Sequence, residues 1–219
     1  MGYKQSISCI NKKSITRSFK NLRMNKTFLI VLNILFFTTA CENEDGQNTI
    51  YQVNIAAQGA CMEAEMEGLT ASLCVLDTNG ISKTEFAQNE NFSIALTFQN
   101  NIGENIKIKN EYLNGESVMI VEGVADGLNH GKPYTSVSCE FVGNPNMEIP
   151  PGGSYVVSSP WVLQEGIRTI GLVCKGESNE YLAVGSYRVI VSLDFIMEMG
   201  DKTISVEGGN ELGLGFDIM

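Results

Sequence analysis

The single histidine and the acidic side chains are the residues through which this chain could do acid–base or metal chemistry. A Ser-His-Asp or Cys-His arrangement would have to use His130, which lies in the glycine-containing segment Asp126–Pro133. The residues around it do not have the pattern of a nucleophile elbow. We therefore expect a solvated loop histidine and no enzymatic activity. With one histidine and no Cys-x-x-Cys pair, no metal site is expected either.

The 25 Asp and Glu residues offer no better catalytic candidate. Glycoside hydrolysis needs two carboxyl groups about 5 to 10 Å apart with different pKa values. On a chain with this many acids, such pairs arise by chance. The stretch Asp77–Gly80 has two ligand types and the glycine of a calcium loop, but it lacks the spaced acidic partner. It is interpreted as a hairpin turn, and no catalytic residue or cofactor is predicted.

Four cysteines remain for disulfide chemistry once Cys9 and Cys41 are set aside, and they allow three pairings. If Tyr51–Ala60 and Leu69–Leu76 formed a hairpin, Cys61 would lie near its turn and Cys74 several residues along the second strand. At about 3.3 Å per residue this is too far for a disulfide. Cys61–Cys74 is therefore disfavoured. Cys139 is in phase with apolar neighbours, which predicts either a buried thiol or a core disulfide with Cys174.

A different chemistry, covalent modification, is predicted at Cys41. Residues Met24–Cys41 contain a cation near the start (Lys26), an apolar run over Phe28–Phe37, and the small residues Thr38–Ala40 directly before the cysteine. This order is typical of an export signal, and the apolar run is too short to span a bilayer of about 30 Å.

With its cysteine placed directly after small residues, the segment resembles a lipoprotein signal of the Bacteroidetes type. The resemblance implies cleavage before Cys41, acylation of Cys41 and anchoring in the outer membrane, since each buried methylene contributes about 0.8 kcal/mol. Thr38 stands where lipoboxes usually have leucine, a position that Bacteroidetes signals relax. Residues 1–40 are the predicted leader. Translation from Met24 would give a signal of ordinary length, and a long basic region from Met1 is the alternative.

The charge of the mature part excludes one class of partner. Seven of the 15 Lys and Arg residues precede Cys41 and no acid does, so eight cations face 25 acids and the net charge is −17. No nucleic-acid partner is expected for a body this acidic. Residues 41–48 form a polar, acidic tether. This run resembles the signal that sends Bacteroidetes lipoproteins to the cell surface, and a spacer facing the periplasm is the alternative.

Residues 49–219 have the length of one domain with a sizeable core, and their pattern is β throughout. Apolar residues alternate with polar ones in Phe92–Phe98 and again in Tyr187–Phe195, as in strands with one buried face. Short strands separated by turn formers, without a helical period, predict an all-β, immunoglobulin-like antiparallel β-sandwich. Further strands are predicted at Tyr51–Ala57, Leu69–Leu76, Asn105–Lys109, Ser117–Glu122, Ser136–Val142, Tyr155–Ser159, Ile167–Cys174, Thr203–Val206 and Leu212–Ile218.

Three stretches resemble the BsuPI-like (intracellular proteinase inhibitor) domains. Asn89–Asn100 resembles their opening strand, Ile149–Trp161 their proline-glycine turn followed by a strand and a tryptophan, and Leu182–Val189 their Gly-x-Tyr-x-Val strand. The match covers about Gln88 to Leu193 and implies an immunoglobulin-like fold. It implies no reliable activity, because such folds host unrelated functions.

The predicted ligand-contacting region is the loop Ala125–Ser136, because sandwich modules place variable loops at the ends of a rigid frame. Trp161, the one tryptophan, is predicted to pack in the core, and a stacking platform for a sugar ring is the alternative. Candidate ligand residues are Asn129, His130, Lys132, Tyr134 and Trp161.

Two functions of different classes follow from these observations. The first is a non-enzymatic envelope lipoprotein that holds to the membrane through Cys41 and binds a glycan or an envelope protein. The second is a protease-inhibitor-like module, suggested by the BsuPI resemblance alone.

Overall fold

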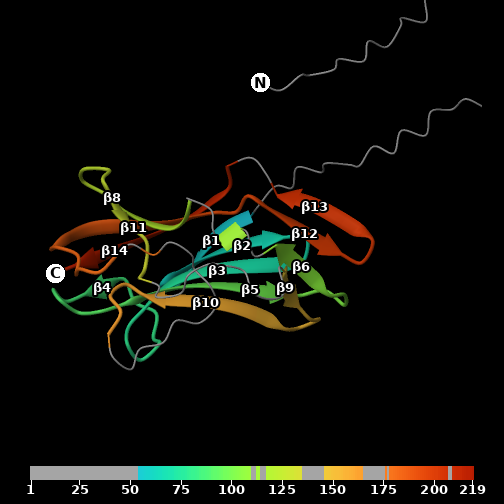
Figure 1. Cartoon of the computed structure of the whole chain (residues 1–219), viewed down its shortest axis with the longest axis horizontal. Coiled ribbons are helices and arrows are strands. Elements are labelled where there is room, and N and C mark those ends of the chain that lie inside the picture. Colours follow the sequence, from blue (N-terminus) through green and yellow to red (C-terminus); the bar gives the residue numbers. More distant parts are fainter. Residues whose placement is uncertain are drawn as a thin grey trace, which may run out of the picture. The chain divides into compact units, whose positions relative to one another are not determined.

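The computed structural model describes residues 54–109, 112–113, 117–134, 146–164, 176, 178–206 and 209–219. All of them fall within one compact unit, Gln47–Met219. These residues form fourteen β-strands and no α-helix, and the strands assemble into three sheets. The predicted all-β fold, with antiparallel sheets packed as a sandwich, is confirmed (Figure 1).

The first sheet is antiparallel and has the strand order β1-β2-β3-β5-β10. Its central strand, β3, alternates strictly between buried and half-buried side chains, because one face of the sheet covers the core and the other does not. The strands are β1 (Asn54–Gln58), β2 (Cys61–Met66), β3 (Leu69–Leu76), β5 (Ser93–Asn100) and β10 (Ser154–Pro160).

The second and third sheets lie along the first. β14 packs against β2 and β3, and β9 approaches β5 and β10, so all three sheets enclose one hydrophobic core (Figure 1). β14 and β4 pair in parallel, whereas the other strand pairs are antiparallel. The second sheet contains β4 (Glu85–Phe86), β14 (Glu211–Ile218), β11 (Gly185–Ser192), β7 (Val118–Gly123) and β8 (Asn129–Gly131); the third contains β13 (Lys202–Val206), β12 (Phe195–Met199), β6 (Ile106–Lys109) and β9 (Asn146–Ile149).

Aromatic rings fill the core in two groups. Phe98, Tyr112 and Phe195 meet edge to face, with ring centroids 5.1 to 6.1 Å apart, and Tyr112 donates a buried hydrogen bond to the Ser192 carbonyl at 2.5 Å. Burial raises the pKa of Tyr112 far above its usual value, so this phenol remains a neutral donor. The other group surrounds Phe92 at the opposite end of β5 and adjoins the site described below.

Most predicted strands are present with small shifts at their ends, and β3 has the predicted bounds. The prediction missed β2, β4, β8 and β9, and it treated β12 as the end of β11. The chain in fact leaves the second sheet at Leu193 and Asp194 and enters the third at Phe195. The predicted strands Ser136–Val142 and Ile167–Cys174 lie outside the described residues. The Asp77–Gly80 turn is confirmed, with the Asp77 carboxylate accepting bonds from the Asn79 and Ile81 amides.

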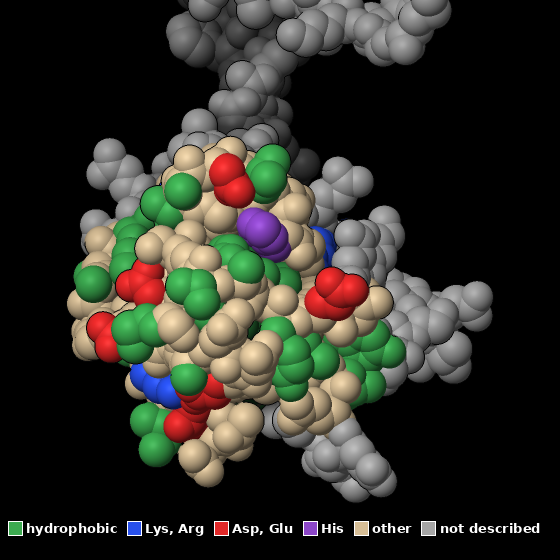
Figure 2. Space-filling model, turned by 90° about the vertical axis from the view of Figure 1, so that its left-hand side faces the viewer, with side chains coloured by type: hydrophobic (Ala, Val, Ile, Leu, Met, Phe, Trp, Pro, Cys, Tyr) green, Lys and Arg blue, Asp and Glu red, His purple; other side chains and the backbone are tan. Residues whose placement is uncertain are grey.

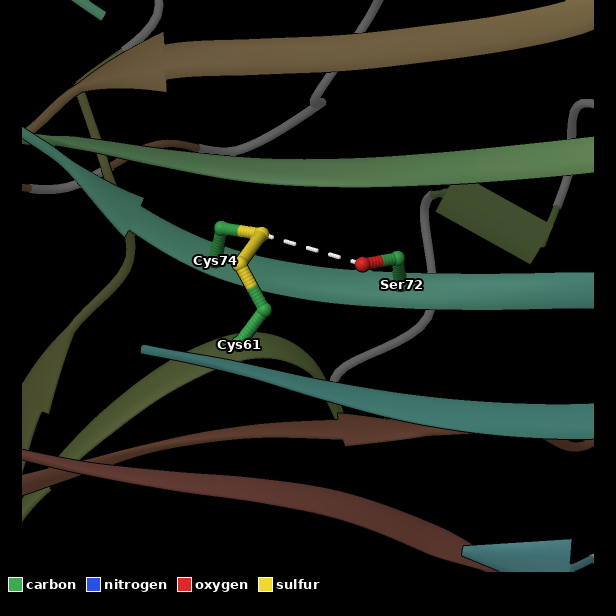
Figure 3. The surroundings of a disulfide bond; sticks show 3 residues. All are labelled: Cys61, Ser72 and Cys74. Atoms are coloured by element: carbon green, nitrogen blue, oxygen red, sulfur yellow. Dashed lines mark hydrogen bonds between the residues drawn. A yellow bond between two sulfur atoms is a disulfide. The ribbon is translucent and has the colours of Figure 1, made fainter. Parts of the chain in front are cut away.

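The prediction against a Cys61–Cys74 disulfide is wrong. β2 lies between β1 and β3, and its register pairs Cys61 directly with Cys74, so their Cα atoms are 4.5 Å apart and the sulfurs are bonded (Figure 3). The assumed hairpin skipped β2 because its turn is only two residues long. Both turn residues, Glu67 and Gly68, have positive φ, the backbone of a tight hairpin turn. Cys139 and Cys174 lie outside the described residues.

Candidate functional site

Three loops that are far apart in the sequence meet at one end of the sandwich. They are the β7–β8 hairpin with the residues after it, the residues that follow β10, and the segment Ser178–Ala183 before β11. The Tyr134 amide donates to the Trp161 carbonyl at 3.2 Å, and the Ser178 amide donates to the Lys132 carbonyl at 3.1 Å. Trp161 Nε1 donates to the Glu180 carbonyl at 2.9 Å. These bonds hold the three loops in one arrangement.

Between these loops lies an open pocket of about 260 Å³. Aromatic side chains and polar side chains both line it, and none of its described lining residues is a lysine or an arginine. Figure 2 looks onto this end of the sandwich and shows the histidine in purple at the surface, with hydrophobic side chains in green around it. The lining residues are His130, Trp161, Ser178, Asn179, Glu180, Tyr181, Leu182, Ala183 and Tyr187.

Trp161 belongs to the core, as predicted. It is 1% exposed, and its ring stacks on Phe92 with centroids 5.6 Å apart and an angle of 12° between the planes. The side chain of Asn91 clamps Val162, the residue after Trp161, by two hydrogen bonds: its Nδ2 donates to the Val162 carbonyl and its Oδ1 accepts from the Val162 amide. Trp161 therefore lines the pocket without presenting a free ring face, and the sugar-platform alternative does not apply to it.

Tyr187 forms the link between the core and the pocket. Its ring stacks on Phe216 at 5.7 Å, meets the His130 ring edge to face at 5.2 Å, and its hydroxyl donates to the Ala183 carbonyl at 2.9 Å. Burial, and secondarily the Asp126 charge, raise the pKa of Tyr187. The phenol therefore remains protonated and holds the Ala183 end of the pocket segment in place.

The tip of the β7–β8 hairpin places Asp126 and His130 close together over Gly123. A Cβ at Gly123 would lie 2.3 Å from Asp126 Oδ1 and 3.2 Å from His130 Nε2, so only glycine leaves room for both side chains. Asp126 Oδ1 also accepts from the Leu128 amide at 2.9 Å, which closes the tip. The serine hydroxyl of the pocket, Ser178 Oγ, donates to the Glu180 carbonyl at 3.4 Å, within its own loop.

Tyr181 is the aromatic residue of the pocket that the sequence prediction missed. Its side chain is 37% exposed, and Gln164 Nε2 donates to its hydroxyl. The residue sits in the polar stretch Glu177–Tyr181, where an aromatic side chain has no core periodicity to explain it. An isolated aromatic in a polar segment before a strand is the signal that could have identified it.

Two of the five predicted ligand residues, His130 and Trp161, line the pocket. The other three, Asn129, Lys132 and Tyr134, are not among the lining residues but shape the loop beside it. Asn129 Oδ1 accepts from the Gly131 amide at 2.7 Å, and the backbones of Lys132 and Tyr134 bond to the neighbouring loops as described above.

Exposed aliphatic side chains surround the pocket end. Val124 and Leu128 of the hairpin tip and Val184 before β11 are 60 to 62% exposed, and Ile81 and Met219 at the same end are 62% and 63% exposed. Large apolar side chains that gather in the open at one end of a domain are typical of an interaction surface.

A larger hollow of about 760 Å³ lies near the opposite end, between the loop after β5 and the β12–β13 turn. Acidic and basic side chains both line it, including Glu104, Lys107, Glu198, Asp201 and Lys202. Across the described part of the chain, no group of three or more His, Cys, Asp or Glu side chains is arranged to hold a metal ion. Within the same ranges, no helix is long and apolar enough to cross a membrane.

Comparisons with known proteins leave the family open. No protein-family model matches the chain, and no curated protein matches it. A solved structure described as the X-ray structure of Northeast Structural Genomics Consortium target SoR45 aligns at 12% identity over 71% of this chain and 90% of that chain, with a TM-score of 0.32. A likeness this distant carries no argument about function. The resemblances to Bacteroidetes-type lipoproteins and BsuPI-like domains therefore remain predictions.

Proposed function

We propose that the protein is a non-enzymatic envelope lipoprotein, anchored in the outer membrane through Cys41, that uses the pocket end of its sandwich to bind a glycan or another envelope protein. The observation that carries this proposal is the pocket itself. Two loops bring His130, Tyr181 and polar side chains of Ser178–Glu180 to one open hollow, and Trp161 after β10 completes its wall on a rigid β frame. This mixture of aromatic and convergent polar groups is typical of binding sites for small polar ligands.

The first described strand starts at the end of the sandwich opposite the pocket. β1 begins at Asn54, which pairs with Glu65 next to the β2–β3 turn, at the Leu69 end of β3. The pocket lies at the other end, where Leu76 pairs with Ser93 beside the Phe92–Trp161 stack.

The polar groups of the pocket support binding more than catalysis. The Tyr187 phenol has a raised pKa and is engaged with a backbone carbonyl, and the Ser178 hydroxyl is directed to its own loop. Neither group is arranged as a nucleophile activated by His130. Nothing in the described part of the chain favours the protease-inhibitor-like alternative, since the Cys61–Cys74 disulfide joins neighbouring strands and does not brace an exposed loop.

Two experiments on the native lipoprotein test the proposal. Mass analysis of the mature N-terminus should show acylated Cys41, and external protease on intact cells should remove the protein if it faces outward. An acylated but protected protein would place the same function on the periplasmic side. An unmodified chain that starts at Met1 would refute the anchor. Glycan arrays and pull-downs with envelope proteins should give a hit at micromolar concentration, and the absence of any hit would refute the binding function.

A further inference from the structure

We propose that the ligand of the pocket is a single uncharged sugar ring, with Tyr181 as the stacking face and the side chains of His130, Asn179 and Glu180 as its hydrogen-bond partners. This inference rests on the proposed binding function and names the class of ligand. It follows from four properties of the pocket: its size, its charge, the chemistry of its exposed groups and the rigidity of its wall.

The size of the pocket selects a small ligand. Its volume of about 260 Å³ is below the range of roughly 300 to 1,000 Å³ that accommodates drug-sized molecules. The pocket is open on one side, so a ring held in it can still be the end of a longer chain. One saccharide ring fits this volume, whereas a compact oligosaccharide does not.

The charge of the pocket selects an uncharged ligand. Glu180 is the one carboxylate among the described lining residues, and the Asp126 carboxylate lies near His130, over Gly123. Of the residues that the structure describes, no lysine or arginine lines the pocket. A uronic or sialic acid would therefore bring its carboxylate next to like charges, with no cation among the described lining residues to compensate, which is unfavourable.

The exposed groups match the chemistry of a sugar. A pyranose has an apolar face of C–H groups and a rim of hydroxyls, so it needs an aromatic ring beside groups that donate and accept hydrogen bonds. Tyr181 provides an exposed ring, while the other large rings, Trp161 and Tyr187, are buried. Asn179 and Glu180 are exposed, and the backbone carbonyl of Glu180 is already engaged by Trp161, which leaves the two side chains to contact hydroxyls.

The wall that carries these groups is held before the ligand arrives. Four hydrogen bonds fix Ser178–Ala183: the Ser178 amide to Lys132, Trp161 Nε1 to Glu180, Gln164 Nε2 to the Tyr181 hydroxyl, and the Tyr187 hydroxyl to Ala183. A preorganised segment loses little conformational freedom on binding. This matters for a ligand as small as one ring, which makes few contacts.

The test is titration of the mature full-length lipoprotein in detergent with methyl glycosides, followed by saturation-transfer NMR and calorimetry. The neutral probes are the methyl glycosides of glucose, galactose and N-acetylglucosamine, and the acidic probes are those of glucuronic and sialic acid. We expect at least one neutral probe to bind and both acidic probes to bind at least tenfold more weakly. Tyr181→Ala should weaken binding roughly tenfold, whereas Tyr181→Phe should retain most of it.

Two further variants distinguish binding at the pocket from binding elsewhere on the surface and test the role of the pocket's charge. Ile196→Ala removes an exposed aliphatic side chain of β12, in the third sheet, and should leave binding unchanged. Glu180→Lys reverses the charge of an exposed side chain and should shift preference toward the acidic probes, with the fold checked by circular dichroism. Because the side chain of Glu180 is exposed and its backbone bond is retained, this variant should fold.

Other results of these titrations would contradict the inference, the proposed binding function or both. Acidic probes that bind as tightly as neutral ones, or binding unaffected by Tyr181→Ala, would overturn this inference while leaving the binding function intact. Binding to oligosaccharides but to no methyl glycoside would overturn the single-ring assignment alone. No binding to any sugar, together with capture of a defined envelope protein that Tyr181→Ala abolishes, would also overturn the inference and keep the proposed function. No ligand of either kind would refute both.

Discussion

Removal of the Cys61–Cys74 disulfide should destabilise the domain by an amount that the structure allows us to calculate. The two cysteines are 13 residues apart in sequence, and a cross-link over a loop of that length restricts the unfolded chain by about 3 kcal/mol at 25 °C. The native state should change little, because both side chains are only half-buried and the β2–β3 ladder pairs along its full length without the bond. For a domain of this size, 3 kcal/mol corresponds to a loss of about 6 to 12 °C in Tm.

The assay is urea unfolding of the mature double variant Cys61→Ala/Cys74→Ala and of the wild type, both in buffer without added oxidant or reductant. The double variant is preferable to added reductant, which would act on every disulfide of the chain. Ser72→Ala is the matched control, since it removes the Oγ contact to Cys74 Sγ at 3.7 Å and leaves the cross-link intact. The control should lose less than about 0.5 kcal/mol.

Two results would refute this reasoning. A loss below about 1 kcal/mol in the double variant would show that the unfolded chain is not restricted as calculated. Peptide mapping under non-reducing conditions that linked Cys61 to Cys139 or Cys174 would contradict the strand register of β2 and β3 itself.

Three other predictions concern the frame of the site. Asn91→Ala should destabilise the protein by about 2 kcal/mol in urea unfolding, because it leaves the half-buried amide and carbonyl of Val162 without their partner; no loss would contradict the clamp. Ser159→Ala should be neutral or stabilising by up to about 1 kcal/mol, since the buried Ser159 hydroxyl has no hydrogen-bond partner among the described residues; a clear loss of Tm would argue against this. The hydrogen bonds from Lys83 Nζ, at 2.5 Å, and from the Ala87 amide lower the pKa of Glu90. The ionised Glu90 side chain therefore stabilises the folded state above the unfolded pKa of roughly 4.3, and this contribution is lost as the pH falls through the lower folded pKa. Glu90→Gln should flatten the acid limb of a stability-against-pH curve, and an unchanged limb would exclude this pair as a contributor.

Local patterns predicted several elements of the sandwich correctly. The alternation in Leu69–Leu76 gave the bounds of β3, because a strand with one buried face imposes its period of two on the sequence. The Asp77–Gly80 turn was also predictable, since an aspartate that bonds to its own following amides acts over four residues. The core position of Trp161 followed from the large apolar area of its ring.

The strands that the prediction missed have sequences whose local pattern does not identify a strand. Cys61–Met66 has two glutamates and two methionines, and its turn residues Glu67–Gly68 differ from the usual Asn-Gly, so the strand was passed over and the disulfide was assigned wrongly. β8 and β9 are only three and four residues long, too short to show a period.

The all-β class, the approximate position of most strands and the core role of Trp161 could be predicted from the sequence. Those features depend on neighbours along the chain. The Cys61–Cys74 pairing, the contact of His130 with Tyr187, and the pocket that these two rings share with Tyr181 emerge only in the folded chain. They depend on strand register and on loops more than 40 residues apart, as the Ser178 bond to Lys132 shows, and local propensity carries no information about such distances.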